Sequence, residues 1–372
     1  MKYDFLNENM EDISLVNDLM SVYGVWKDAK LFPNRYKITR NMENFLKLPC
    51  FNADSIKDIN KCTSKVIVIN NMTESVHNLW AFRKYDPSKH YIIFSGGDWD
   101  KEKLDVGIPS YDVLYLPWWL LDDAQNNLSL GSLYFFLNKQ YNFDYPKDYI
   151  FCSATGAKRE LRTKLVEQLL ENITYENYIL KYTGIDRKCA SDHLDHDYIK
   201  NDKAVERWVI DDGLKFCPHK DLDDEYNYHI GSSLPMDMYN AAYFNIIVET
   251  DLDYQHSFFV TEKTSKFLLC GMPFVIFSTP FFLKNLQNMG FRTYNTLWNE
   301  EYDTIENTDD RINKIVELVQ TLEHFDWQEN KLKLQEIFRH NLDVMSNRNI
   351  LYDEFFKNLE QTIIKYNEKY NV

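Results

Sequence analysis

The sequence predicts an α/β protein with two domains, a cleft between them and helices at the carboxyl end. Strand-like apolar runs alternate with segments of helical spacing, which is typical of parallel sheets covered by helices on both faces. The pattern starts again after a polar, aromatic tract near the middle of the chain. The 372 residues also exceed what one hydrophobic core usually holds, so two domains are expected.

The amino-terminal half begins with a β-α-β pattern. The runs KVIVIN (65–70) and HYIIFSGG (90–97) are rich in β-branched and aromatic residues and end in turn-forming residues. Between them, TESVHNLWAFRKY (73–85) has helical spacing, and VLYLPWW (113–119) supplies a third strand. Ligands of such sheets gather at the carboxyl ends of the strands. The residues that follow the first two strands are therefore expected at a functional edge.

A second α/β pattern follows the tract 137–149, which we interpret as a linker with the domain boundary near residue 148. Its predicted helices cover 160–173, 261–270 and 310–322, with further amphipathic helix in the tail. Its predicted strands are 149–152, 176–182, 241–250 and 273–277.

Composition and charge exclude several function classes. The formal net charge of −15 argues against a broad surface for nucleic acid, although Lys27, Lys30, Arg35, Lys37 and Arg40 form a local basic cluster. The six cysteines show no CxxC pair, which indicates reduced thiols in a cytosol. Neither a secretory segment nor a run of 18 apolar residues is present, so we expect a cytoplasmic protein without a membrane span.

The loop SATGAKRE (153–160) lies between a predicted strand and a predicted helix. It runs from Ser153 to the basic residues Lys158 and Arg159, and Arg162 follows in the first helical turn. A helix amino terminus favours an anion, so a phosphate would be well placed there. The alternative interpretation is a solvated surface on which these cations pair with Glu160 and Glu167.

The segment FVTEKTSKFLLCGMPFVIF (259–277) carries the most specific signal. Thr261 is a suitable N-cap, and Gly271 is a suitable C-cap for the same helix. Lys263 is unfavourable beside the positive end of a helix, which indicates an anionic neighbour such as a diphosphate. Glu262 accepts hydrogen bonds and is suited to the paired hydroxyls of a ribose.

Together with Glu249-Thr250 and the tract 286–319, this segment resembles the carboxyl-terminal donor domain of GT-B glycosyltransferases, closest to the fucosyltransferase-like and exostosin-like groups. The similarity covers roughly residues 150–325. It implies two Rossmann-like domains: an acceptor-binding domain over 1–147 and a sugar-nucleotide domain over 148–340. A carboxyl-terminal helix over 341–372 would follow, with packing against the first domain as one option.

The resemblance also implies roles for individual residues. Glu262 would bind the ribose and Lys263 the phosphates, and Glu249 would face the donor sugar or the ribose. Arg159 and Lys158 would contact the diphosphate, with Thr261 and Ser153 completing the donor site. Several fucosyltransferase signatures have Asn or Trp where this chain has Thr264 and Ser265, so the donor sugar stays open.

The predicted activity is therefore transfer of a hexose or pentose from a UDP- or GDP-sugar to a hydroxyl acceptor such as a glycan, with inversion. An inverting transfer needs a base for the acceptor proton, and the candidates at predicted strand ends are Glu74, Asp98 and Asp100, with His77 in support. Ordinary surface positions or an Asp N-cap are the alternative. We expect neither a cofactor nor a metal site, since DHLDHDY (192–198) is more typical of a solvated loop.

Three alternatives remain open at this point. The acceptor could be a hydroxymethylated pyrimidine in DNA, which the acidic balance disfavours. The protein could bind sugar nucleotides without catalysing transfer. It could also be another two-domain α/β enzyme, for example a phosphorylase or an epimerase.

Overall fold

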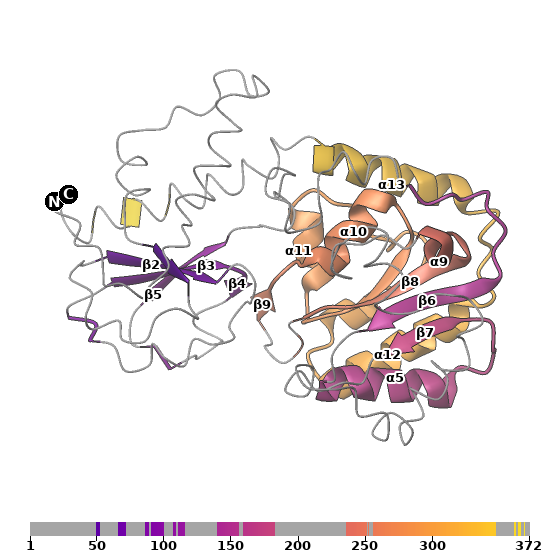
Figure 1. Ribbon diagram of the computed structural model, residues 1–372, viewed down its shortest axis with the longest axis horizontal. Helices are drawn as coiled ribbons and strands as arrows, with labels where there is room; N and C mark the ends of the chain where they lie inside the picture. Colours follow the sequence, from indigo (N-terminus) through magenta and orange to yellow (C-terminus); the bar gives the residue numbers. More distant parts are fainter. Residues whose placement is uncertain are drawn as a thin grey trace, which may run out of the picture. The chain divides into compact units, whose positions relative to one another are not determined.

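The computed structural model divides the chain into two compact units (Figure 1). The first comprises Met1–Leu121, His256–Phe259 and Asn347–Val372, and the second comprises Asp122–Gln255 and Val260–Ser346. The structure describes residues 50–52, 66–71, 86–88, 91–99, 107–108, 111–115, 140–155, 159–182, 236–250, 252 and 256–346, with 361, 364, 365 and 368 near the end.

A parallel sheet forms the described part of the first unit. Its strands run in the order β1 (Cys50–Asn52), β2 (Val66–Asn71), β3 (Tyr91–Gly96) and β5 (Tyr111–Tyr115). The three strands predicted in this half are thus confirmed, whereas the predicted helix over 73–85 lies outside the described residues. A short ribbon of β4 (Asp98–Trp99) and β9 (Ser257–Phe258) pairs antiparallel.

The second unit is built on another parallel sheet. Its order is β10 (Phe274–Phe277), β8 (Ala242–Val248), β6 (Tyr149–Thr155) and β7 (Ile179–Tyr182). Where their burial is described, the residues of these strands are almost entirely buried, as expected for a parallel sheet with both faces covered. The predicted α/β class with parallel sheets is confirmed, and each predicted strand of this half has a counterpart.

Helices cover this second sheet on both faces. In Figure 1, α5 and α12 lie on one side of it and α10 and α13 on the other. Among the described residues, no helix is both long enough and apolar enough to cross a lipid bilayer. The helices are α5 (Glu160–Asn172), α9 (Met236–Asn240), α10 (Glu262–Cys270), α11 (Phe282–Asn288), η6 (Glu301–Thr304), α12 (Thr308–Leu322) and α13 (Lys331–Ser346).

Two segments differ from the boundaries expected from the sequence. The described part of the predicted linker packs on the second unit: Tyr141 is buried, and its hydroxyl donates to the carbonyl of Ala242 over 2.8 Å. Helix α13 continues through position 340, where a boundary was expected, because its apolar positions Leu334, Ile337 and Val344 keep one buried face.

The order in which strands are added to this sheet reverses at β6, between the parallel strands β6 and β8. From β6 the chain moves to β7 at one side, and it then returns to β8 on the other side of β6. In open α/β sheets, ligands bind beside the carboxyl ends of the strands where the order reverses in this way. The described residues after β6 and β8 therefore occupy the position where a ligand is expected.

Candidate functional site

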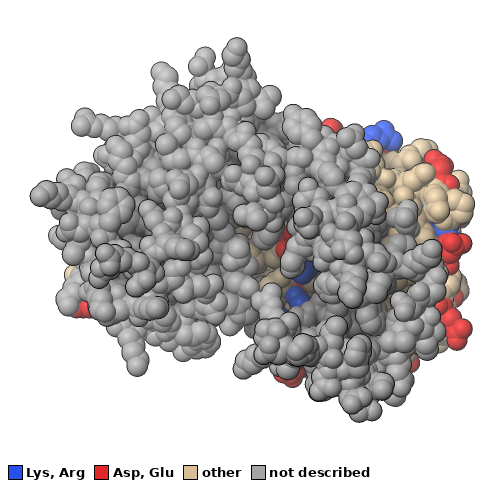
Figure 2. Space-filling view, viewed as in Figure 1, with Lys and Arg blue, Asp and Glu red and all other residues tan. Residues whose placement is uncertain are grey.

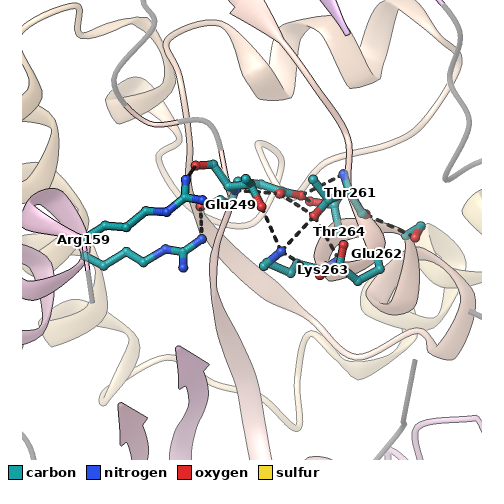
Figure 3. A network of polar contacts seen from close by, with 9 residues as sticks. Arg159, Glu249, Thr261, Glu262, Lys263 and Thr264 are labelled. Atoms are coloured by element: carbon teal, nitrogen blue, oxygen red, sulfur yellow. Dashed lines mark hydrogen bonds and ion pairs between the residues drawn. The ribbon is translucent and has the colours of Figure 1, made fainter. Parts of the chain in front are cut away.

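The candidate site lies at the carboxyl edge of the second sheet, where the segments after β6 and β8 meet the start of α10 (Figure 3). Arg159 immediately precedes α5, and Glu249 directly follows β8. Thr261, Glu262 and Lys263 open α10. The structure thus brings together five of the residues that the sequence assigned to the donor site.

Thr261 is the N-cap of α10, as predicted. Its backbone is extended, and its Oγ1 accepts a hydrogen bond from the backbone N–H of Lys263 over 3.2 Å. The opposite end of the helix also agrees with the prediction, since Gly271 forms the C-cap with a φ of 82°. These two residues define the ends of α10 because each satisfies backbone groups that the helix leaves without partners.

Glu262 and Lys263 form an ion pair of 2.6 Å at the first turn of α10. The Lys263 Nζ also donates to the Oγ1 of Thr250 over 2.9 Å, which directs it back toward the end of β8. Burial acts to raise the pKa of Glu262, but Lys263 and Lys266 outweigh it, and the pKa lies below its usual value. Glu262 is therefore an anionic acceptor at neutral pH.

Two arginines approach the same point from α5. Arg159 donates from Nη1 to the carbonyl of Thr250 over 2.6 Å, and the buried Arg162 donates from Nη2 to the carbonyl of Glu249 over 3.2 Å. Figure 3 shows Arg159 extending from the α5 side toward Glu249. Both contacts are hydrogen bonds from a guanidinium group to a neutral backbone carbonyl oxygen.

Glu249 is fully buried, and its carboxylate points into the protein. Oε1 accepts from the backbone N–H of Thr261 over 3.3 Å and from Oγ1 of Thr264 over 2.5 Å. Oε2 accepts from Oγ1 of Thr261 over 2.6 Å and from the backbone N–H of Thr250 over 3.1 Å. All four of these donors belong to the described residues of the protein, so the carboxylate is held by the turn after β8 and by the start of α10.

Three residues of this cluster were not predicted as site residues from the sequence: Thr250, Thr264 and Lys266. Lys266 is buried, and burial lowers its pKa to about 8, an effect that Glu262 partly offsets. The sequence held a signal for two of them, because Thr264 lies three residues after Thr261 and Lys266 lies four residues after Glu262 on the same helix.

The remaining predicted site residues fall in other places. Ser153 was expected to open the loop, but β6 continues to Thr155, and the Ser153 hydroxyl donates to the carbonyl of Ile246 over 2.8 Å inside the sheet. This correction arises because β6 gains partners on β7 up to Tyr182. Asp98 is exposed in β4 of the first unit. Lys158, Glu74, His77 and Asp100 lie outside the described residues.

Surface charge and cavities complete the description of the described residues. On the face seen in Figure 2, acidic and basic side chains are mixed along the outer edge, without a broad basic surface among the described residues. One cavity of about 60 Å³ includes Tyr243 and Trp327, and one of about 360 Å³ includes Trp298 and Leu318. Neither is lined by the residues of the candidate site. In the described ranges, no group of His, Cys, Asp and Glu residues could hold a metal.

Comparisons with protein-family models and with curated protein sequences find no match for this chain. The α/β fold with parallel sheets is therefore the class that the structure defines, and the site is interpreted from its own geometry.

Proposed function

We propose that the second unit binds a nucleoside diphosphate sugar at the carboxyl edge of its sheet, and that the protein is a glycosyltransferase. In this proposal the sugar passes to a hydroxyl acceptor with inversion, and neither a metal nor a cofactor takes part. The observation that carries the proposal is the gathering of cations around Glu249-Thr250, beside the reversal of strand order between β6 and β8.

Charge at the site favours a dianion. Four of its described side chains are cationic, namely Arg159, Arg162, Lys263 and Lys266, and two are anionic, namely Glu249 and Glu262. These six residues therefore carry a formal charge of +2, in a chain whose net charge is −15. A diphosphate carries the opposite charge, and the arginines offer planar donors suited to phosphate oxygens.

The start of α10 adds two further features. Its positive end favours phosphate in the same way as the neighbouring cations. Glu262 is anionic and only partly buried, which suits a carboxylate that accepts hydrogen bonds from the two hydroxyls of a ribose. Phosphate and ribose recognition would thus fall on one helical turn.

Transfer would then follow from charge stabilisation at the leaving group. A base removes the proton of the acceptor hydroxyl while the acceptor oxygen bonds to the anomeric carbon, and the bond from that carbon to the diphosphate breaks. The departing diphosphate keeps the electron pair, and the cations at the site stabilise its charge. Glu74, Asp98 and His77 remain the proposed residues for the acceptor side.

Titration calorimetry with UDP, GDP and their common sugar derivatives tests the binding step. The variants Arg159→Ala and Lys263→Ala should each weaken binding by about 10- to 100-fold, because each removes a charged hydrogen bond to phosphate. Lys164→Ala is the matched control, since it removes a charge from α5 whose exposed ion pair with Asp309 lies away from the site.

Two results would contradict the proposal. If the unchanged protein binds none of these nucleotides, the donor site is refuted. If Lys164→Ala weakens binding as much as Lys263→Ala does, only general charge attraction is involved. A screen for slow hydrolysis of each bound sugar nucleotide then separates a transferase from a protein that binds without catalysis.

A further inference from the structure

The carboxylate of Glu249 has no remaining capacity to accept a hydrogen bond from a ligand. A carboxylate offers about four lone-pair positions. Four protein donors occupy them here: two hydroxyls, from Thr261 and Thr264, and two backbone N–H groups, from Thr250 and Thr261. Glu249 itself has no exposed surface, and Thr264 has none either.

Three of these four donors belong to the start of α10. Glu249 therefore ties the end of β8 to the N-cap residue and to the first turn of the neighbouring helix. Because an unpaired buried carboxylate is strongly destabilising, this arrangement has few alternatives once the sheet has formed. The orientation of the first turn of α10 is set by the position of one side chain.

Hydrogen bonds also connect Glu249 and its neighbours to the cationic side chains of the site. Thr261, held by Glu249, accepts from the N–H of Lys263, and the Lys263 Nζ returns to Thr250. The backbone carbonyls of Glu249 and Thr250 in turn receive Arg162 and Arg159. A displacement of Glu249-Thr250 would thus move the contacts of all three cations.

From this geometry we infer that Glu249 and Thr264 are a positioning pair: they hold Thr261, Glu262 and Lys263 in place for the nucleotide and do not contact the donor sugar. This inference rests on the proposed function. It also gives a reason for Thr264 and Ser265, where the chain departs from fucosyltransferase signatures. The Thr264 hydroxyl completes the shell around Glu249, and the Ser265 hydroxyl donates to the carbonyl of Thr261 over 3.2 Å.

Two substitutions separate positioning from direct contact. Thr264→Val removes one hydroxyl with little change in shape, and Glu249→Gln replaces one acceptor oxygen with a donor. Both should weaken the binding of UDP or GDP and of the matching sugar nucleotide by the same factor, about tenfold, because the shared diphosphate and ribose contacts are misplaced. Thr264→Ser should restore binding. Thr321→Val on α12 is the control, since its hydroxyl donates to the carbonyl of Leu318 in the same helix over 2.7 Å.

A selective result would overturn the inference. If Glu249→Gln weakens the sugar nucleotide but leaves the free diphosphate unchanged, Glu249 contacts the sugar. If Thr264→Val leaves both affinities unchanged, its hydroxyl does not position the site.

Amide hydrogen exchange in the absence of any ligand provides an independent measurement. Exchange over residues 261–266 should accelerate in Thr264→Val and Glu249→Gln, while exchange in α12 stays the same. Unchanged exchange over 261–266 would refute the positioning pair whether or not nucleotides bind. Lack of nucleotide binding by the unchanged protein would refute the proposed function instead, and exchange alone would then decide whether Glu249 and Thr264 hold this turn.

Discussion

Replacing Gly271 with alanine should disrupt the packing of α10 against α13. Gly271 ends α10 with a φ of 82°, a conformation that costs an L-residue roughly 1–2 kcal/mol. A Cβ at this position would lie 2.3 Å from Cδ2 and 2.4 Å from Cγ of Phe338 on α13. Since these are ring atoms near the fixed end of the side chain, α13 must shift or Phe338 must leave its rotamer.

The combined effect should be a loss of about 2–5 kcal/mol in the free energy of unfolding, because overpacking of this kind adds roughly 1–3 kcal/mol to the backbone strain. Denaturant unfolding followed by circular dichroism measures the loss. The double variant Gly271→Ala with Phe338→Ala should be less destabilised than the sum of the two single variants, because the second change removes the clash. Additive losses would refute the steric explanation, and a loss below about 1 kcal/mol for Gly271→Ala would refute the strain as well.

Three further predictions concern buried ionisable groups. Burial raises the pKa of Glu300 to about 7, despite hydrogen bonds from Thr293 and Tyr294 that act to lower it. As the pH rises, the Glu300 carboxyl group loses its proton in the unfolded chain before it does so in the folded protein. The free energy of unfolding should therefore fall between pH 4.5 and about 7, by at most roughly 3 kcal/mol. Denaturant titrations across this range should show a smaller fall for Glu300→Gln. The carboxylate of Asp303 accepts hydrogen bonds from the N–H groups of Leu283 and Lys284 over 2.8 and 3.1 Å, so it caps α11 from a distant segment. Asp303→Ala should lower the free energy of unfolding by about 2–4 kcal/mol, measured by thermal unfolding. A change of less than about 0.5 kcal/mol would contradict this capping role. Burial lowers the pKa of Lys266 to about 8, so between pH 8 and pH 10.5 the unfolded chain holds more protons than the folded protein. The free energy of unfolding should therefore rise with pH in that range. If it rises equally in Lys266→Met, Lys266 is not the cause.

Much of the second unit follows from local patterns in the chain. Apolar runs of strand length predicted β6, β8 and β10, and the spacing of Leu165 and Leu169 predicted α5. The N-cap Thr261 and the C-cap Gly271 were also predictable, because capping depends on residues within one helical turn. The ion pair between Glu262 and Lys263 was not predicted, because the sequence assigned one residue to a ribose and the other to phosphates.

The inward orientation of the Glu249 side chain could not be predicted from local sequence patterns. Its position after a strand is the same whether the side chain faces a ligand or the protein interior. Its four donors come from residues 1, 12 and 15 positions away, and they meet only because β8 packs beside α10. Ser153 illustrates the same limit, since the extent of β6 depends on pairing with β7.

The amino-acid sequence alone was sufficient for the α/β class, the position of most strands and both ends of α10, because these depend on periodicity and on hydrogen bonds between near neighbours. The order of the strands, the meeting of Arg159 with Thr250 and the inward orientation of Glu249 became visible once the chain was folded. Those features depend on which distant segments are buried together, since a buried charge takes its partners from whatever elements surround it.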